Sequence, residues 1–125
     1  MSDTAGERSY LKSHTIEGDL LTFDLNAVAR DLQSTEARRQ GVALVKEAGL
    51  NIVLSTLPSG ERLAEHTARG ASSLLVLDGR VRVQAGGQAQ ELPAGSLAAF
   101  NAGVPHEVEA LETSTVLVTV AMTSP

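Results

Sequence analysis

The sequence predicts an all-β fold, an antiparallel double sheet or jelly-roll barrel, preceded by a single N-terminal α-helix. Downstream of Gly41, apolar and polar residues alternate in short runs, as expected of strands with one buried face. Turn-forming residues such as Asp78-Gly79 and Gly86-Gly87 separate these runs at hairpin spacing. With one Tyr, two Phe and no Trp in 125 residues, the core must be built from Val, Leu and Ala.

The segment before the predicted helix has little regular pattern. Residues 1–15 are polar and aperiodic, so we expect a mobile arm in which His14 lies in solvent. Residues 16–23 are expected to form either a short edge strand or an extended lead-in to the helix. The single barrel domain is therefore expected to span residues 16–125.

One segment has the apolar spacing of an amphipathic helix. Leu25, Val28 and Leu32 recur at helical intervals, and Asp24 before them is a suitable N-cap. We expect the helix to begin near residue 25 and to end between residues 34 and 40, at about residue 38. A lone amphipathic helix before a run of strands is expected to pack its apolar stripe on the outside of the barrel.

The rest of the chain is expected to form short strands joined by turns. Gly, Pro and Asn mark the turns between them. The expected strands are residues 42–47, 50–57, 61–67, 72–77, 80–84, 88–92, 96–100, 106–111 and 115–121. Eight or nine short strands after one helix are typical of an antiparallel jelly roll.

Charge balance and cysteine content limit the classes of function. Fifteen acidic and ten basic residues give a net charge of −5 without a basic cluster, so no nucleic-acid partner is expected. The sequence has no cysteine, which excludes disulfides and thiol chemistry. It shows neither a signal-like N-terminus nor an apolar run of membrane-spanning length, so no membrane partner is expected and the cytoplasm is the expected location.

Two of the three histidines stand in short motifs framed by glycine. In the first motif, His66 follows a glycine after five residues, and Gly79 closes the segment in a predicted hairpin. In the second, Gly95 precedes a turn that ends at Gly103, and His106 begins the next alternating run. Because a barrel can bring such strands together, the two histidines are candidates for a ligand or metal site.

Side-chain alternation predicts which motif residues face the interior. If His66 points into the barrel, Ala68 does too. On the neighbouring strands, the residues that share one face are Ser72, Leu74 and Val76, and then His106, Val108 and Ala110. An interior with two imidazoles, one hydroxyl and otherwise small apolar groups is typical of a small-molecule site. Glu65 and Glu107 have the opposite parity and are expected to face outward.

The first motif resembles that of the cupin superfamily. There, a glycine is followed by five residues, His-x-His, three or four residues, a Glu, six residues and a Gly. Gly60, His66 and Gly79 match this pattern, whereas Ala68 stands in place of the second His and Ser72 in place of the Glu.

The second motif also resembles a cupin motif, in which a glycine is followed by five residues, Pro-x-Gly, two residues and a His. Gly95, Gly103 and His106 match, whereas Asn101 replaces the Pro and Ala110 replaces the closing Asn. The resemblance spans about residues 42–121 and is closest to small, single-domain bacterial cupins. It implies a cupin-type double-stranded β-helix barrel. It also implies a divalent metal held by three His and one carboxylate, a set that is incomplete here.

Three functions are compatible with these residues, in this order of preference. The first is binding or sensing of a small molecule, with His66 and His106 as polar anchors in a cavity lined by Ala68, Ser72, Leu74, Val76 and Val108. The second is a metal-dependent enzyme of the dioxygenase or isomerase type, in which the same two histidines hold Zn, Mn, Fe or Ni weakly. The third is a structural or interaction module that forms a homodimer by pairing exposed strand edges, with residues 16–23 as the exchanged strand. Each histidine taken alone is compatible with a purely structural role, bonded to a hydroxyl such as that of Ser72.

Overall fold

The structure is a computed structural model, and it describes residues 14–34, 41–66 and 70–121. Along these residues one helix and nine strands follow in the predicted order. They are α2 (Leu25–Ser34), β1 (Gly41–Lys46), β2 (Leu50–Leu57), β3 (Arg62–His66), β4 (Ser72–Asp78), β5 (Arg80–Ala85), β6 (Gln88–Pro93), β7 (Leu97–Phe100), β8 (His106–Ala110) and β9 (Ser114–Ala121). Each strand begins and ends within one residue of its expected bounds.

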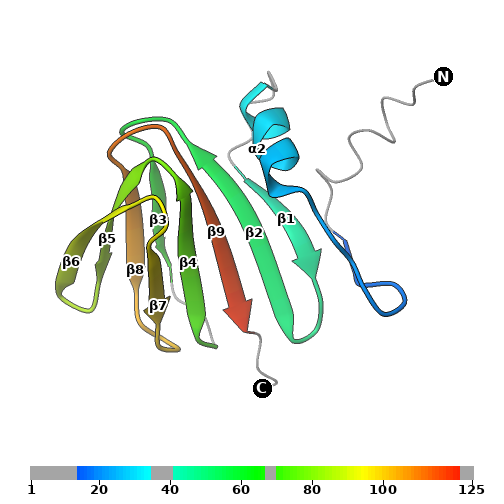
Figure 1. The fold of residues 1–125 in the computed structure, drawn as a ribbon. Helices are drawn as coiled ribbons and strands as arrows, with labels where there is room; N and C mark the ends of the chain where they lie inside the picture. Colours follow the sequence, from blue (N-terminus) through cyan, green and yellow to red (C-terminus); the bar gives the residue numbers. More distant parts are fainter. Residues whose placement is uncertain (1–13, 35–40, 67–69, 122–125) are drawn as a thin grey trace.

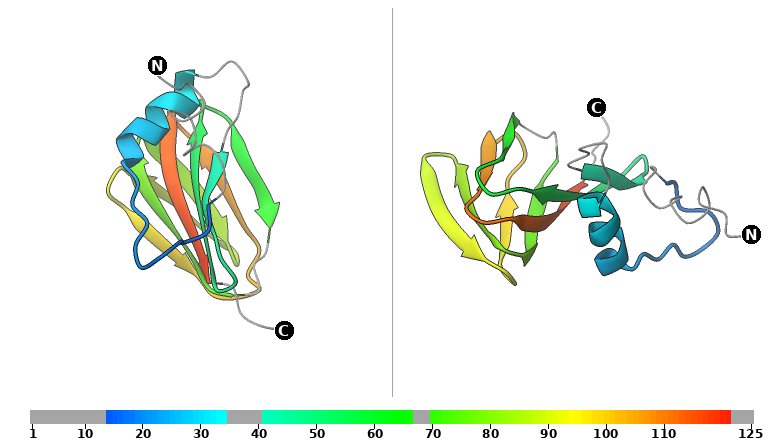
Figure 2. Two further views of the ribbon diagram at one scale, coloured as in Figure 1. Left: turned by 90° about the vertical axis from the view of Figure 1, so that its right-hand side faces the viewer. Right: turned by 90° about the horizontal axis from the view of Figure 1, so that it is seen from above.

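The strands form two antiparallel sheets that face each other (Figures 1 and 2). The five-stranded sheet has the order β1-β2-β9-β4-β7, and the four-stranded sheet has the order β3-β8-β5-β6. On the side of β1 the larger sheet extends past the barrel, and α2 lies there (Figure 1). The predicted jelly-roll barrel with one preceding helix is therefore confirmed for the described residues.

Aliphatic side chains fill the space between the two sheets, as the composition predicted. Alternate residues of β4 and of β8 are buried, which confirms the predicted parity of both strands. Phe100 is the aromatic member of this core. The buried cluster consists of Leu57, Leu74, Val76, Val81, Val83, Phe100, Val108, Ala110 and Val116.

The hairpin between β4 and β5 depends on Gly79. Its φ of 86° lies in the left-handed region, which glycine adopts without steric cost. A Cβ atom at this position would also lie 2.3 Å from Ser114 Oγ and 2.4 Å from the carbonyl oxygen of Thr113. Both the turn and the close approach of the β8–β9 connection therefore require glycine here.

The helix packs on the outside of the barrel, as predicted. Asp24 caps its N-terminus, because Asp24 Oδ1 accepts hydrogen bonds from the backbone N–H groups of Asn26 and Ala27 at 3.1 and 3.2 Å. Val28 and Leu32 are 1% and 2% exposed, and they pack against apolar residues of β1 and β2. The helix ends at Ser34 in the described residues, and its expected end near residue 38 lies outside them.

The segment before the helix is an extended lead-in and not an edge strand. It turns at Gly18, where φ is 71°. The expectation that His14 lies in solvent is wrong, because the residue is only partly exposed and its Nδ1 is buried. Its backbone also pairs with the edge of β1. The His14 N–H donates to the Leu44 carbonyl at 3.2 Å, and the Lys46 N–H donates to the His14 carbonyl at 2.8 Å. Residues 1–13 of the arm expected at residues 1–15 lie outside the described residues.

Within the part of the chain that the structure describes, no helix has both the length and the apolar character needed to cross a bilayer.

Candidate functional site

The two candidate histidines are direct partners across neighbouring strands. In the antiparallel β3–β8 pair, the backbone of His66 lies opposite that of His106, and Leu63 lies opposite Val108. A register shift separates these two pairings. The fold therefore brings the two motifs together at one end of the barrel. The side chain of His66 and the whole of Ala68 lie outside the described residues.

His106 is buried at the start of β8, with 3% of its surface exposed. Its Nδ1 atom lies 3.1 Å from the carbonyl oxygen of Val104. Because a carbonyl oxygen only accepts hydrogen bonds, Nδ1 carries a proton and is the donor in this contact. This hydrogen bond sets the orientation of the ring, as the second hydrogen bond of a ligand-binding imidazole commonly does.

Phe100, the last residue of β7, stacks on the His106 ring. The two ring centroids are 4.2 Å apart and the ring planes differ by 8°. Phe100 is one of only two phenylalanines in the chain and was not among the residues predicted for the site. A local signal was present, because Phe100 directly precedes the turn of the second motif, at residues 101–103.

Ser72 lies beside Phe100 on the inner face of the larger sheet. It is 7% exposed, and its register partners are Phe100 on β7 and Val120 on β9. Ser72 Oγ has no hydrogen-bond partner among the described side chains, which do not include that of His66, so a bond between Ser72 and His106 is absent. An unpaired buried hydroxyl costs about 1–3 kcal/mol. Ser72 is therefore a polar group that a ligand could satisfy.

A pocket of about 250 Å³ opens between β5, β6 and β7. Because β6 and β7 are edge strands of the two sheets, the pocket lies on the open side of the barrel. Eight of its ten lining residues, Phe100 among them, have apolar side chains and two are glutamines, and the pocket exposes polar and apolar surface in similar amounts. The lining residues are Val83, Ala85, Gln88, Ala89, Gln90, Leu92, Leu97, Ala98, Ala99 and Phe100.

Three of the predicted cavity-lining residues lie in the packed core and not on the wall of this pocket. Leu74, Val76 and Val108 face inward, as predicted, but they are at most 1% exposed. Inward-facing side chains of one sheet meet those of the other, and aliphatic groups of this size fill the gap between the sheets. Parity predicts which way a side chain points, but not how much space is left in front of it.

The described residues do not fit a metal centre of three His and one carboxylate. No group of three or more His, Cys, Asp or Glu side chains that could hold a metal ion occurs among them. Glu107 faces away from the interior, as its parity predicted, and pairs with Arg62 at 3.9 Å across β3 and β8. Arg62 also lies 4.0 Å from Glu109, so both carboxylates of β8 are directed to an exposed cation.

Comparisons with known proteins agree with this fold. A model of the cupin domain matches residues 53–122, which is more than half of the chain. The comparison with curated proteins gave no match.

Solved structures of the same fold come from several bacteria. A conserved protein of unknown function from Streptococcus pyogenes is 20% identical, with a TM-score of 0.69 over 91% of this chain and 96% of that one. A cupin superfamily protein from Desulfitobacterium hafniense is 19% identical, with a TM-score of 0.64 over 66% of this chain and 76% of that one. The oxalate decarboxylase of Bacillus subtilis, which has Mn(II) centres, is 25% identical, with a TM-score of 0.57 over 63% of this chain and 22% of that one.

Proposed function

The chain belongs to the cupin family, and from that premise we propose that its barrel binds or senses a small molecule, with His106 and His66 as polar anchors. The site comprises the pocket on the open side of the barrel and the end of the β3–β8 pair. Phe100 connects these two parts, since it lines the pocket and stacks on His106. This double contact of Phe100 is the observation that carries the proposal.

The pocket favours a small ligand that is partly apolar. Its volume of about 250 Å³ lies just below the usual range of ligand pockets. Aliphatic groups and one aromatic ring would contact the body of the ligand, and the amides of Gln88 and Gln90 lie on the β6 side for a polar substituent. A ligand group that passes Phe100 would reach the imidazole of His106 and the hydroxyl of Ser72.

Screening a fragment library by ¹⁵N NMR tests this proposal. We expect bound fragments to shift the amide signals of residues 83–100. The Ala85→Leu variant should weaken binding at least tenfold, because Ala85 lines the pocket and is the register partner of His106. Ala48→Leu, the same change at an exposed turn position, is the matched control. Fragments that bind Ala85→Leu as tightly as the parent protein would contradict the proposal.

The second candidate function is a metal-dependent cupin enzyme of the dioxygenase or isomerase type. Two observations favour it: His66 and His106 are direct backbone partners, and Nδ1 of His106 donates to a carbonyl, as metal-bound imidazoles commonly do. The Mn(II) centres of the Bacillus subtilis enzyme give a precedent within this fold. Two imidazoles would hold Zn, Mn, Fe or Ni weakly, with water completing the coordination.

Metal analysis separates the two candidates. Untagged protein purified without added metal should contain far less than one metal ion per chain under the first proposal and about one under the second. In the second case, His66→Gln and His106→Gln should each abolish metal binding.

A second experiment rebuilds the missing ligands. Ala68→His with Ser72→Glu would restore the full ligand set of the motif, and we expect affinity for Zn²⁺ or Mn²⁺ to rise by about 100-fold or more.

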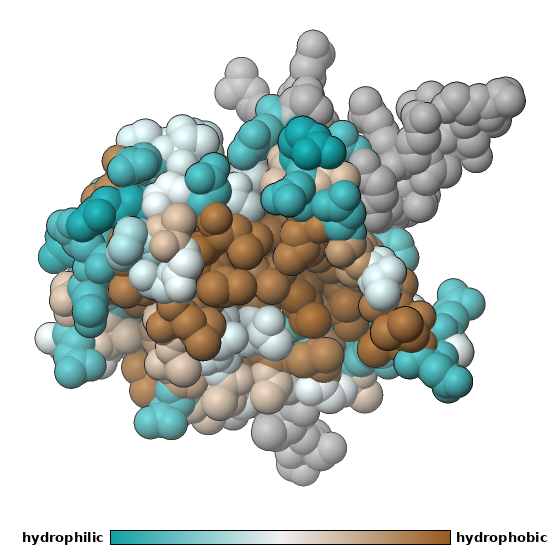
Figure 3. Space-filling view, viewed as in Figure 1, coloured by the Kyte–Doolittle hydropathy of each residue, from teal (hydrophilic) through white to brown (hydrophobic). Residues whose placement is uncertain are grey.

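The third candidate is a homodimer, favoured by an apolar surface on the outer face of the larger sheet (Figure 3). Leu97 is 65% exposed, and Leu75 of β4 lies opposite both Leu97 and Leu117 in the register. In the described lead-in, Ile16 and Leu20 are 42% and 77% exposed. Two chains of net charge −5 repel each other, so an apolar face is the surface through which they would associate. Sedimentation equilibrium should give twice 13.0 kDa at micromolar concentration, and a Leu97→Glu variant should give the monomer.

A further inference from the structure

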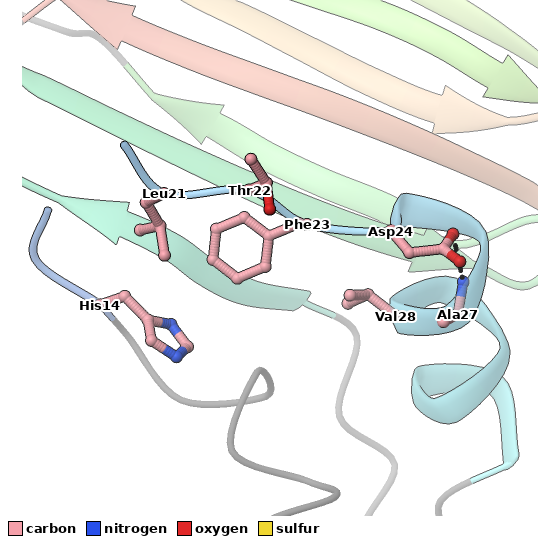
Figure 4. Close-up of a pocket in the computed structure, with 7 residues that line it drawn as sticks. All are labelled: His14, Leu21, Thr22, Phe23, Asp24, Ala27 and Val28. Carbon is pink, nitrogen blue, oxygen red and sulfur yellow. Dashed lines mark hydrogen bonds between the residues drawn. The ribbon is translucent and has the colours of Figure 1, made fainter. Parts of the chain in front are cut away.

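A second pocket, of about 310 Å³, lies outside the barrel between the lead-in and the first turns of α2. None of the described residues lines both this pocket and the barrel pocket. Its wall consists of His14, Leu21, Thr22, Phe23, Asp24, Ala27 and Val28. Figure 4 shows the side chains of Leu21, Phe23 and Val28 directed into the same space as the His14 imidazole.

Hydrogen bonds hold both walls of this pocket. On one side, the backbone of His14 is bonded to Leu44 and Lys46 on β1, and the Ile16 N–H donates to the Glu47 carboxylate. On the other side, the carboxylate of Asp24 caps the helix. The pocket is therefore formed before any ligand arrives, and little ordering is required on binding.

The imidazole of His14 brings an unsatisfied polar atom to the pocket wall. Its ring packs edge to face against Phe23, with centroids 5.3 Å apart and planes at 71°. Among the described residues, His14 Nδ1 is buried and has no hydrogen-bond partner. Buried polar atoms in folded proteins are nearly always paired, so this atom is an exception. Because the χ2 torsion of histidine has broad minima, a small ring rotation can bring Nδ1 to a ligand.

The chemistry of the wall defines the class of ligand. Leu21, Phe23, Ala27 and Val28 contribute apolar groups. The exposed carboxylate of Asp24 disfavours an anion, since it would place two negative charges together. We infer that this pocket binds a small, uncharged molecule with an apolar body and one hydroxyl group, which forms a hydrogen bond with the His14 imidazole.

Phenol is a suitable probe, because it combines an apolar ring with one hydroxyl. In ¹⁵N NMR titrations, we expect it to shift the amide signals of residues 14–28, with a dissociation constant on the order of millimolar for so small a ligand. Toluene, which lacks the hydroxyl, and benzoate, which carries a charge, should each bind about tenfold more weakly.

Two variants test the His14 imidazole and the apolar space of the pocket separately. His14→Phe keeps a ring and leaves the backbone bonds to β1 in place; it should weaken phenol binding about tenfold without changing toluene binding. Ala27→Leu fills the pocket with a good helix former and should abolish binding of both probes. If either variant fails to fold, the comparison of phenol, toluene and benzoate on the unmodified chain still decides the question.

Equal affinity for phenol and toluene, or unchanged phenol binding by Ala27→Leu, would overturn the inference. Shifts confined to residues 83–100 would also overturn it, because they would place the probe in the barrel pocket. The barrel proposal is independent of this result, since Ala85→Leu affects only that pocket.

Discussion

Two regions of the molecule place a histidine against a phenylalanine, and they do so in opposite ways. At the end of the barrel, His106 lies parallel to Phe100, and its Nδ1 donates to a backbone carbonyl. Beside the helix, His14 meets Phe23 edge to face, and its buried Nδ1 has no hydrogen-bond partner among the described residues. The orientation of the first imidazole is set by a hydrogen bond and a parallel stack, whereas the ring of the second has only the edge-to-face contact with Phe23.

The difference follows from the elements that carry the two residues. His106 starts a strand whose two neighbours, β3 and β5, both pair with it, so the ring sits in a closed core. His14 is held by backbone bonds to one edge strand, β1. Backbone hydrogen bonds position the residue, but they do not determine which contacts its side chain makes.

Removing each imidazole should separate the two regions most clearly. His106→Ala loses the ring stack and the bond to Val104 and leaves a cavity, so we expect a loss of about 2–4 kcal/mol in the free energy of unfolding. His14→Ala removes a half-buried ring without a bond at Nδ1, and about 1 kcal/mol or less is expected. Urea denaturation measures both values, and equal losses would show that the two environments do not differ.

Replacing each histidine with phenylalanine isolates the hydrogen bond, because a ring of similar shape is kept. His106→Phe removes the hydrogen bond to the part-buried carbonyl of Val104 and should cost about 1–3 kcal/mol. His14→Phe removes an unpaired polar atom and should be neutral or stabilising by up to about 1 kcal/mol. Thermal melting should therefore show a lower melting temperature for His106→Phe and an unchanged or higher one for His14→Phe. A destabilised His14→Phe protein would mean that the His14 imidazole has a partner in solution.

Loss of the helix cap should affect only the region around His14. Asp24→Ala removes two hydrogen bonds to the first turn of α2, and a typical N-cap contributes about 1 kcal/mol. Hydrogen exchange should then become faster in residues 25–32 and stay unchanged in β8. Asp24→Asn, which keeps a capping oxygen, is the matched control. Faster exchange around His106 would show that the two regions are coupled.

Ser72 allows a smaller test, inside the barrel, of whether a buried polar group without a partner lowers stability. Its buried hydroxyl is unpaired, as is His14 Nδ1. Ser72→Ala removes this penalty but also loses the packing of Oγ, so the free energy of unfolding should rise by no more than about 1 kcal/mol. Ser114→Ala is the contrasting variant, because Ser114 Oγ accepts from the Arg80 N–H and lies 2.7 Å from the Glu112 carbonyl. A loss of more than 1 kcal/mol at Ser72, measured against the same reference, would mean that the hydroxyl has a partner.

The elements were predictable because their signals are local. Alternation from residue to residue located each strand, Gly79 marked the β4–β5 hairpin, and Asp24 marked the start of the helix. Each of these depends on a few consecutive residues, whose conformational preferences act without the rest of the fold. The spacing of Leu25, Val28 and Leu32 likewise predicted which face of the helix is buried.

By itself, the sequence determined the strands, the helix, their inward faces and the placing of two histidines in matching motifs. Only the tertiary structure decided that His66 lies opposite His106, that Phe100 stacks on His106, and that Leu74, Val76 and Val108 fill the core. It also decided that His14 lies against Phe23 on the wall of a second pocket. Each of these contacts joins side chains from separate elements. Register and packing between distant segments set them, and no local preference encodes either one.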